Sequence, residues 1–159
     1  MPHIFFELEG FEEKHLTFAG LFLLSNRLDT IATQILEELT AKQWFLLATL
    51  STFQAPPSLS ELAGRMGSSR QNVKQIALKL EQKGFVQINR DPLDSRVLRV
   101  QPAEGAEEYE RLHQAENAAF IDRLYRDIPA EDLRAMLRVL VSLDSNLEQL
   151  QQERAESAE

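Results

Sequence analysis

Between Ser69 and Lys79 the sequence carries side chains whose types and spacing could bind a nucleic-acid duplex. Their polar groups are hydroxyls, amides and cations, with no carboxylate among them. An amide can form two hydrogen bonds with the edge of adenine, and lysine and arginine can contact phosphate oxygens. The candidate contact residues are Ser69, Arg70, Gln71, Asn72, Lys74, Gln75 and Lys79.

These polar residues need a helix that buries its opposite side. The segment from Ser69 to Gly84 predicts one, because its apolar residues recur at the spacing of one helical face. A shorter helix is predicted just before it, over residues 59–66, with Ser58 or Ser60 as its N-cap and Gly67 at its end. The apolar residues of the second helix are Val73, Ile76, Ala77 and Leu80.

A hairpin is predicted directly after the second helix. Residues 85–89 alternate apolar and polar side chains as a half-buried strand does, and residues 97–100 can return as a second strand. The charged loop between them contains Pro92 and presents Arg90 and Arg96. Two adjacent helices followed by such a hairpin predict a winged helix-turn-helix in a mainly α protein of about six helices.

The charge is distributed unevenly along the chain. The net charge of −8 over 159 residues would by itself argue against a nucleic-acid partner, since an acidic surface repels phosphate. Residues 58–102, however, hold eight basic and four acidic residues, so this segment has a net charge of +4 and the remainder −12. The basic segment favours a duplex partner, while a helix face that merely contacts solvent is the alternative.

The composition argues against several other functions. The chain has no cysteine, which excludes disulfides, thiolate zinc sites and thiol redox switches. His113 and Glu116 have helical spacing, but two potential ligands without a third do not predict a metal site. We find no nucleophile with an evident base and no glycine-rich phosphate loop, so we expect neither an enzyme nor a cofactor. His3 and His15, like His113, are scattered along the chain.

Location is predicted from the apolar stretches. The amino terminus, from Met1 to Glu7, lacks the basic region and continuous apolar core of a signal peptide. The longest apolar stretch, residues 18–24, is too short to span a bilayer. We therefore expect a cytoplasmic protein.

The helices that precede the basic segment are strongly apolar. Residues 12–39 predict one long helix whose apolar side chains occupy more than half of its circumference, which predicts contact with a second chain. Phe18 and Phe22 could instead line a ligand cavity. A following helix has Thr40 as its predicted N-cap and is ended by Pro56 and Pro57. Its expected inner residues are Trp44, Leu47, Ala48 and Leu50 or Ser51.

The carboxyl-terminal part predicts two more long helices. Pro102 and Gly105 allow a change of direction before a helix over about residues 106–126, and Pro129 is expected in the first turn of the last helix. That helix carries apolar residues spaced alternately four and three apart, a coiled-coil-like dimer seam that needs a facing helix. Residues 1–39 and 103–159 thus predict a dimerisation region, and residues 40–102 a DNA-binding lobe. The dimer seam consists of Met136, Leu140, Leu143, Leu147 and Leu150.

The order of elements from about Leu16 to Leu150, and four short segments within it, resemble the MarR family of bacterial transcriptional regulators. Two departures are visible. The wing has Asp94-Ser95-Arg96 where the family usually reads Asp-Arg-Arg, and Gln101-Pro102 stands where the family often has Leu-Thr. The four segments are Leu59-Ser60-Glu61-Leu62-Ala63, Ser69-Arg70-Gln71-Asn72-Val73, Leu80-Glu81-Gln82-Lys83-Gly84-Phe85-Val86 and Asp91-Pro92-Leu93-Asp94-Ser95-Arg96.

The resemblance implies a homodimer that reads a pseudo-palindromic operator. Each recognition helix would enter a major groove, and each wing would lie along the backbone or in the minor groove. Arg96 matches the arginine that reaches for the minor groove, and Asp94 the acid that orients it. It also implies repression that is relieved by a small aromatic or anionic effector, bound between the dimer helices and the DNA-binding lobe. Sensing of peroxide through a cysteine is excluded here. The expected effector residues are His15, Phe18, Phe22 and Trp44.

We therefore predict a sequence-specific regulator that binds double-stranded DNA as a homodimer. Gln71, Asn72 and Gln75 are expected to read bases. Arg70, Lys74 and Lys79 are expected to contact phosphates. The alternative is a winged-helix domain that serves as a protein-interaction or scaffold module without DNA, which the acidic remainder of the chain keeps open.

Overall fold

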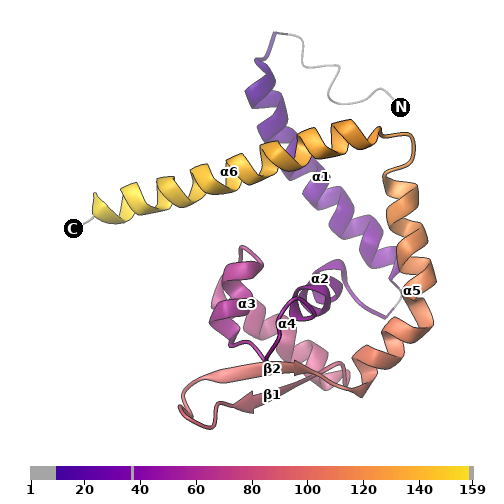
Figure 1. Cartoon of the computed structure of the whole chain (residues 1–159), viewed down its shortest axis with the longest axis vertical. Helices are drawn as coiled ribbons and strands as arrows, with labels where there is room; N and C mark the ends of the chain where they lie inside the picture. Colours follow the sequence, from indigo (N-terminus) through magenta and orange to yellow (C-terminus); the bar gives the residue numbers. More distant parts are fainter. Residues whose placement is uncertain (1–9, 37, 158–159) are drawn as a thin grey trace. The chain divides into compact units, whose positions relative to one another are not determined.

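The computed structural model describes residues 10–36 and 38–157. The predicted fold class is confirmed: these described residues are mainly helical and include a small antiparallel hairpin. His3 and the segment from Met1 to Glu7 lie outside the described residues. The elements, shown in Figure 1, are α1 (Glu13–Ile35), α2 (Ala41–Leu50), α3 (Leu59–Arg65), α4 (Arg70–Gln82), β1 (Val86–Arg90), β2 (Leu98–Pro102), α5 (Glu104–Leu124) and α6 (Ala130–Glu156).

The chain divides into two compact units, and their boundary falls within α5. The first unit ends at Gln114 and holds α1 to α4, the hairpin and the first half of α5. The second unit begins at Ala115 and holds the rest of α5 and all of α6. The assignment of residues 1–39 and 103–159 to dimerisation and of residues 40–102 to DNA binding concerns function, and it stays a prediction.

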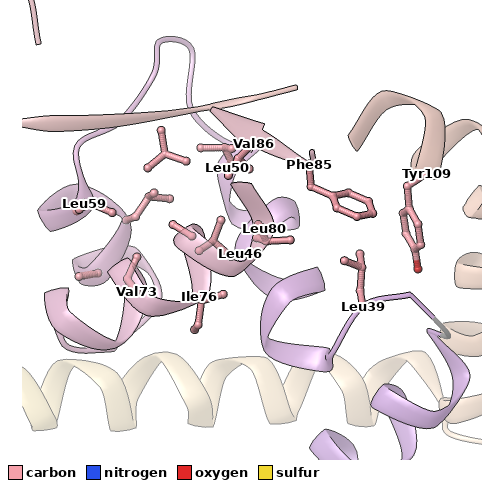
Figure 2. Close-up of a cluster of buried hydrophobic side chains, with 14 of the residues drawn as sticks. Leu39, Leu46, Leu50, Leu59, Val73, Ile76, Leu80, Phe85, Val86 and Tyr109 are labelled. Carbon is pink, nitrogen blue, oxygen red and sulfur yellow. The ribbon is translucent and has the colours of Figure 1, made fainter. Parts of the chain in front are cut away.

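The core of the first unit joins α2, α3 and α4 to the hairpin. Figure 2 shows side chains from all of these elements in one cluster. The four apolar residues predicted for the inner face of α4 are all buried, which confirms the orientation of that helix. The largest fully buried side chains of the unit are Leu39, Leu46, Leu59, Leu62, Leu80, Val73, Val86 and Val100.

The helices α2 and α3 begin at capping boxes that the sequence encodes locally. The Thr40 hydroxyl accepts a hydrogen bond from the Gln43 backbone N–H at 3.3 Å, and the Gln43 side chain accepts one from Thr40 N–H at 3.1 Å. Ser58 and Glu61 form the equivalent pair at α3, so Ser58 rather than Ser60 is the N-cap. Such a cap satisfies helix N–H groups that have no partner within the helix.

The predicted inner face of α2 was wrong by part of a turn. Gln43, Leu46 and Thr49 are buried together with Leu50, whereas Trp44 and its neighbours Leu47 and Ala48 are only half-buried. Apolar residues lie on more than one side of this short helix, so their spacing alone does not fix which side faces the core.

The hairpin follows the end of α4 closely. Gly84 adopts a φ of 79°, a left-handed conformation that glycine accepts without strain. Each strand begins one residue later than predicted, and β2 extends to Pro102, which pairs with Val86. Pro102 therefore ends the strand instead of turning the chain, since a proline at the strand terminus removes no interior ladder hydrogen bond.

The long helices also differ in their bounds from the prediction. The helix α1 ends at Ile35, because the chain turns where the Leu39 N–H donates to the Leu36 carbonyl at 3.2 Å. The helix α5 begins at Glu104, so Gly105 lies inside its first turn. Pro129 is the N-cap of α6 rather than a residue of its first turn, and α6 has no buried residue.

Candidate nucleic-acid interface

The residues predicted to contact DNA lie together on α4. Ser69 is the N-cap of this helix and the other six belong to it, and all seven are exposed. Gln71, Gln75 and Lys79 are spaced four residues apart and form one stripe, beside which lie Arg70 and Lys74. The opposite side of α4 is buried in the core, so this polar face is the side that α4 turns away from the first unit.

Two of these residues also make hydrogen bonds within the helix start. The Ser69 hydroxyl accepts the Asn72 backbone N–H at 3.2 Å and so caps α4. The Asn72 side-chain nitrogen donates to the Ser68 hydroxyl at 2.9 Å. The amide nitrogen has two N–H donors, so this bond leaves one N–H and the carbonyl oxygen of the Asn72 side chain for a base edge.

No carboxylate competes for cations on the polar face of α4. Glu81 is the acidic residue of α4, and its side chain accepts a hydrogen bond from the Ile88 backbone N–H of β1 at 2.8 Å. At the end of the helix, the Lys83 ammonium donates to the Glu38 carbonyl at 2.5 Å. Arg70, Lys74 and Lys79 therefore give the exposed face a positive potential that suits phosphate.

The loop of the hairpin presents Arg96. Its side chain is 89% exposed, and its guanidinium binds Asp94 through two hydrogen bonds of 3.0 and 2.9 Å. The Arg96 backbone N–H also donates to Asp94, at 3.0 Å. These contacts hold the pKa of the Asp94 carboxyl below its usual range, the guanidinium contributing most. The pair limits the directions in which Arg96 can extend.

Arg90 is exposed at the end of β1, and its side chain contacts the loop. Its guanidinium donates to the Ser95 carbonyl at 2.8 Å, so this side chain braces the loop beside Arg96. Leu93 extends from the same loop and is 97% exposed. Both predicted wing cations are therefore exposed: the Arg96 guanidinium pairs with Asp94, and that of Arg90 binds the Ser95 carbonyl.

Sequence reasoning missed the pair formed by Asp91 and Arg99. The Arg99 side chain donates from Nε to the Asp91 carboxylate and from a terminal nitrogen to the Pro56 carbonyl, at 2.8 Å for the latter. The hydrogen bond from Arg99 is the main cause that lowers the pKa of the Asp91 carboxyl. The available signal was an arginine between two apolar strand residues, but its partner depends on the strand register.

An apolar groove lies in the first unit, between α2, the end of β2 and the start of α5. Its volume is about 690 Å³. Trp44 lines this groove, whereas His15, Phe18 and Phe22 lie on α1 and do not, so the structure does not gather the four predicted effector residues there. Phe18 and Phe22 instead pack edge to face at 5.1 Å and are both exposed. The aromatic and charged side chains that line the groove are Trp44, Tyr109, Glu107, Glu110 and Arg111.

No three histidine, aspartate or glutamate side chains within residues 10–36 and 38–157 converge on a potential metal position. In the same part of the chain, none of the helices combines the length and apolarity needed to cross a membrane.

Comparison with known proteins places this geometry in context. The MarR family model matches residues 39–98. The transcriptional activatory protein BadR of Rhodopseudomonas palustris is 28% identical over 138 residues, which cover 84% of this chain and 79% of that protein.

Solved structures of regulators are similar in fold. A MarR/EmrR family transcriptional regulator from Acinetobacter sp. superposes with a TM-score of 0.74 at 18% identity, over 87% of this chain and 99% of that one. The organohalide-sensing transcriptional regulator RdhR, in its form bound to 2,4-dichlorophenol, superposes with a TM-score of 0.75 at 18% identity, over 92% and 86% of the two chains.

Proposed function

Because this chain belongs to the MarR family of transcriptional regulators, we propose that it regulates transcription by binding double-stranded DNA sequence-specifically. The observation that carries this proposal is the exposed, acid-free face of α4 beside a wing that presents Arg96. A helix with such a face fits the major groove, and a wing arginine can reach the adjacent minor groove. Such a protein would act in the cytoplasm, where a bacterial chromosome lies.

We assign different roles to the amides and the cations of α4. Gln71, Gln75 and Asn72 would hydrogen-bond base edges, because amides match the paired donor and acceptor of adenine. Lys79, near the carboxyl end of α4, would contact phosphate together with Arg70 and Lys74. In helix-turn-helix proteins the amino-terminal part of the recognition helix contacts bases, which agrees with the places of Gln71 and Asn72 in the first turn of α4.

We propose that the active form is a homodimer. The dimer seam of α6 is mainly exposed, and Leu147 and Leu150 are 58% and 60% exposed. Met136 and Leu140 also line an apolar pocket of about 210 Å³ within the second unit. An apolar stripe of this length in contact with water favours association. A two-fold dimer would read two half-sites about one helical turn apart.

Repression is the direction of regulation that we propose. A dimer bound across promoter DNA occludes polymerase, and this effect requires no further partner. The R. palustris relative is named as an activatory protein. A reporter gene behind the bound sequence distinguishes the directions, because deleting the regulator raises expression under repression and lowers it under activation.

We further propose that the groove beside Trp44 binds a small aromatic effector. Trp44 and Tyr109 give it aromatic walls, and Glu107 and Glu110 lie at its edge. Arg111 also lines it but binds Glu108 at 2.6 and 3.1 Å, so the groove favours an uncharged aromatic compound over an anion. Trp44 is the single tryptophan of the chain, so its fluorescence reports directly on titration with phenol and with benzoate.

The experiment that tests DNA binding is selection of bound duplexes from a random pool at fixed salt. We expect wild type to enrich a pseudo-palindrome with half-sites about ten base pairs apart. The Arg96→Ala variant is expected to enrich it less, because the wing contact is lost. If wild type enriches no duplex, the proposal of DNA binding is wrong, and the alternative function is that of a protein-interaction module.

A further inference from the structure

Arg99 joins the wing to the rest of the first unit. It lies in β2, opposite Asn89 of β1, and its side chain is 38% exposed. Its guanidinium has two hydrogen-bond acceptors and a further ion-pair partner. They are the carboxylate of Asp91, the carbonyl of Pro56 at 2.8 Å and the carboxylate of Glu61 at 3.7 Å.

On the wing side, Asp91 links Arg99 to the backbone of the hairpin loop. Asp91 is 9% exposed, and while one carboxylate oxygen binds Arg99, the other accepts the backbone N–H groups of Leu93 at 2.7 Å and Asp94 at 3.1 Å. The Asp94 carboxylate in turn accepts hydrogen bonds from the backbone N–H and the guanidinium of Arg96. A continuous series of hydrogen bonds therefore leads from Arg99 to the arginine at the surface of the wing.

On the other side, Arg99 contacts the start of α3. Glu61 belongs to the capping box of that helix, and its carboxylate accepts the Ser58 backbone N–H at 2.7 Å. The backbone of Ser58 also forms an isolated antiparallel β-bridge with that of Arg99, and the Val100 N–H donates to the Pro57 carbonyl at 2.9 Å. Since α3 packs on α4 in the same unit, Arg99 relates the wing to the polar face of α4.

We propose that Arg99 is a positioning residue that sets the place of Arg96 relative to α4, so that both reach one duplex together. This inference rests on the proposed DNA binding and adds the residue that determines the geometry of the two contacts. Arginine suits the role because its planar group can donate in several directions at once, which a lysine ammonium on a flexible stem does not reproduce. Partly exposed ion pairs contribute little to stability, so a substitution at Arg99 should change the position of the wing more than the free energy of unfolding.

The test combines DNA binding with Arg99→Lys, Arg96→Ala and the double variant, using the selected duplex. Each single variant is expected to bind about 10- to 100-fold more weakly, the range for one lost charge-assisted contact. The double variant should bind no more weakly than the weaker single variant, because Arg99 acts through Arg96. Losses that multiply in the double variant, or unchanged binding by Arg99→Lys, would overturn the proposal. Lys14→Met, which removes an exposed ion pair at the start of α1, is the control and should keep wild-type affinity.

A second measurement needs no DNA, so it separates this inference from the proposed function. Hydrogen exchange of the Leu93, Asp94 and Arg96 amides should accelerate at least tenfold in Arg99→Lys, because their acceptors lose their anchor. The buried Val73 amide should exchange as in wild type. Asp91→Asn should give the same pattern from the other end of the pair. Unchanged exchange in both variants would show that Arg99 does not hold the loop, whether or not the protein binds DNA.

Discussion

The first turn of α5 is fixed against the end of α4, and the substitution Gly105→Ala tests how tightly. The Gly105 N–H donates to the Gly84 carbonyl at 3.2 Å. A Cβ atom at position 105 would lie 2.6 Å from that carbonyl oxygen and 3.0 Å from its carbon. Both atoms belong to the backbone, and Gly84 has a φ of 79° that ends α4, so no side chain can move aside.

The size of the effect follows from this contact. Restoring an ordinary separation of 3.4 Å to the oxygen requires the start of α5 to shift by about 0.8 Å. Overpacking of this kind costs about 1–3 kcal/mol. Replacing a helical glycine with alanine contributes about 1 kcal/mol in the opposite direction, so the free energy of unfolding should fall by up to about 2 kcal/mol.

Gly64→Ala is the matched control because Gly64 is helical, in α3, and no atom lies within 4 Å of its added Cβ. It should raise the free energy of unfolding by up to about 1 kcal/mol. Both variants gain the same helix stabilisation from the glycine-to-alanine change. The difference between their free energies of unfolding, measured by urea denaturation, therefore isolates the contact with Gly84 and should be about 1–3 kcal/mol. Equal stabilities of the two variants at one protein concentration would refute the close approach of α5 to α4.

Four further outcomes are expected. Thr40→Ala removes the cap of α2 and should lower the free energy of unfolding by about 1 kcal/mol, measured by urea denaturation; an unchanged midpoint would contradict the capping box. Leu46→Ala should cost about 2–5 kcal/mol because that side chain is fully buried, whereas Leu93→Ala should stay within about 0.5 kcal/mol; similar losses would show that the core is misplaced. The pKa of Asp91 is lowered in the folded chain, so the ionised carboxylate stabilises the fold above the usual aspartate pKa of about 3.9, and this stabilisation is lost as the pH falls through the lower folded pKa. The free energy of unfolding of Asp91→Asn should therefore vary less with pH below about 4 than that of wild type. An equal pH dependence of the two proteins would contradict the pairing of Asp91 with Arg99. Leu147→Glu places charge in the dimer seam and should yield a monomer by sedimentation at micromolar concentration; a monomeric wild type would instead show that the seam has another role.

Local patterns predicted much of this molecule, and long-range contacts limited the rest. The inner face of α4 and the cap at Thr40 depend on residues within one or two turns, so spacing and residue type sufficed. The side of α2 that faces the core was ambiguous because apolar residues lie on more than one side of this helix. Trp44 was expected in the core but lines a groove. Arg99 depends on hairpin register and on Pro56, 43 positions away, while Gly105 depends on a close approach to Gly84. Neither contact is visible in a single sequence.

The most direct test of the central proposal compares Gln75→Ala with Lys79→Ala, two exposed residues one turn apart on α4. Affinity for the selected duplex and for one with altered half-sites would be measured across a range of salt concentrations. We predict that Gln75→Ala reduces discrimination between the duplexes and leaves the salt dependence unchanged. Lys79→Ala should weaken both duplexes equally and lower the slope of log affinity against log salt by about one. Identical effects of the two substitutions, or none from either, would contradict the proposal that this face of α4 reads DNA.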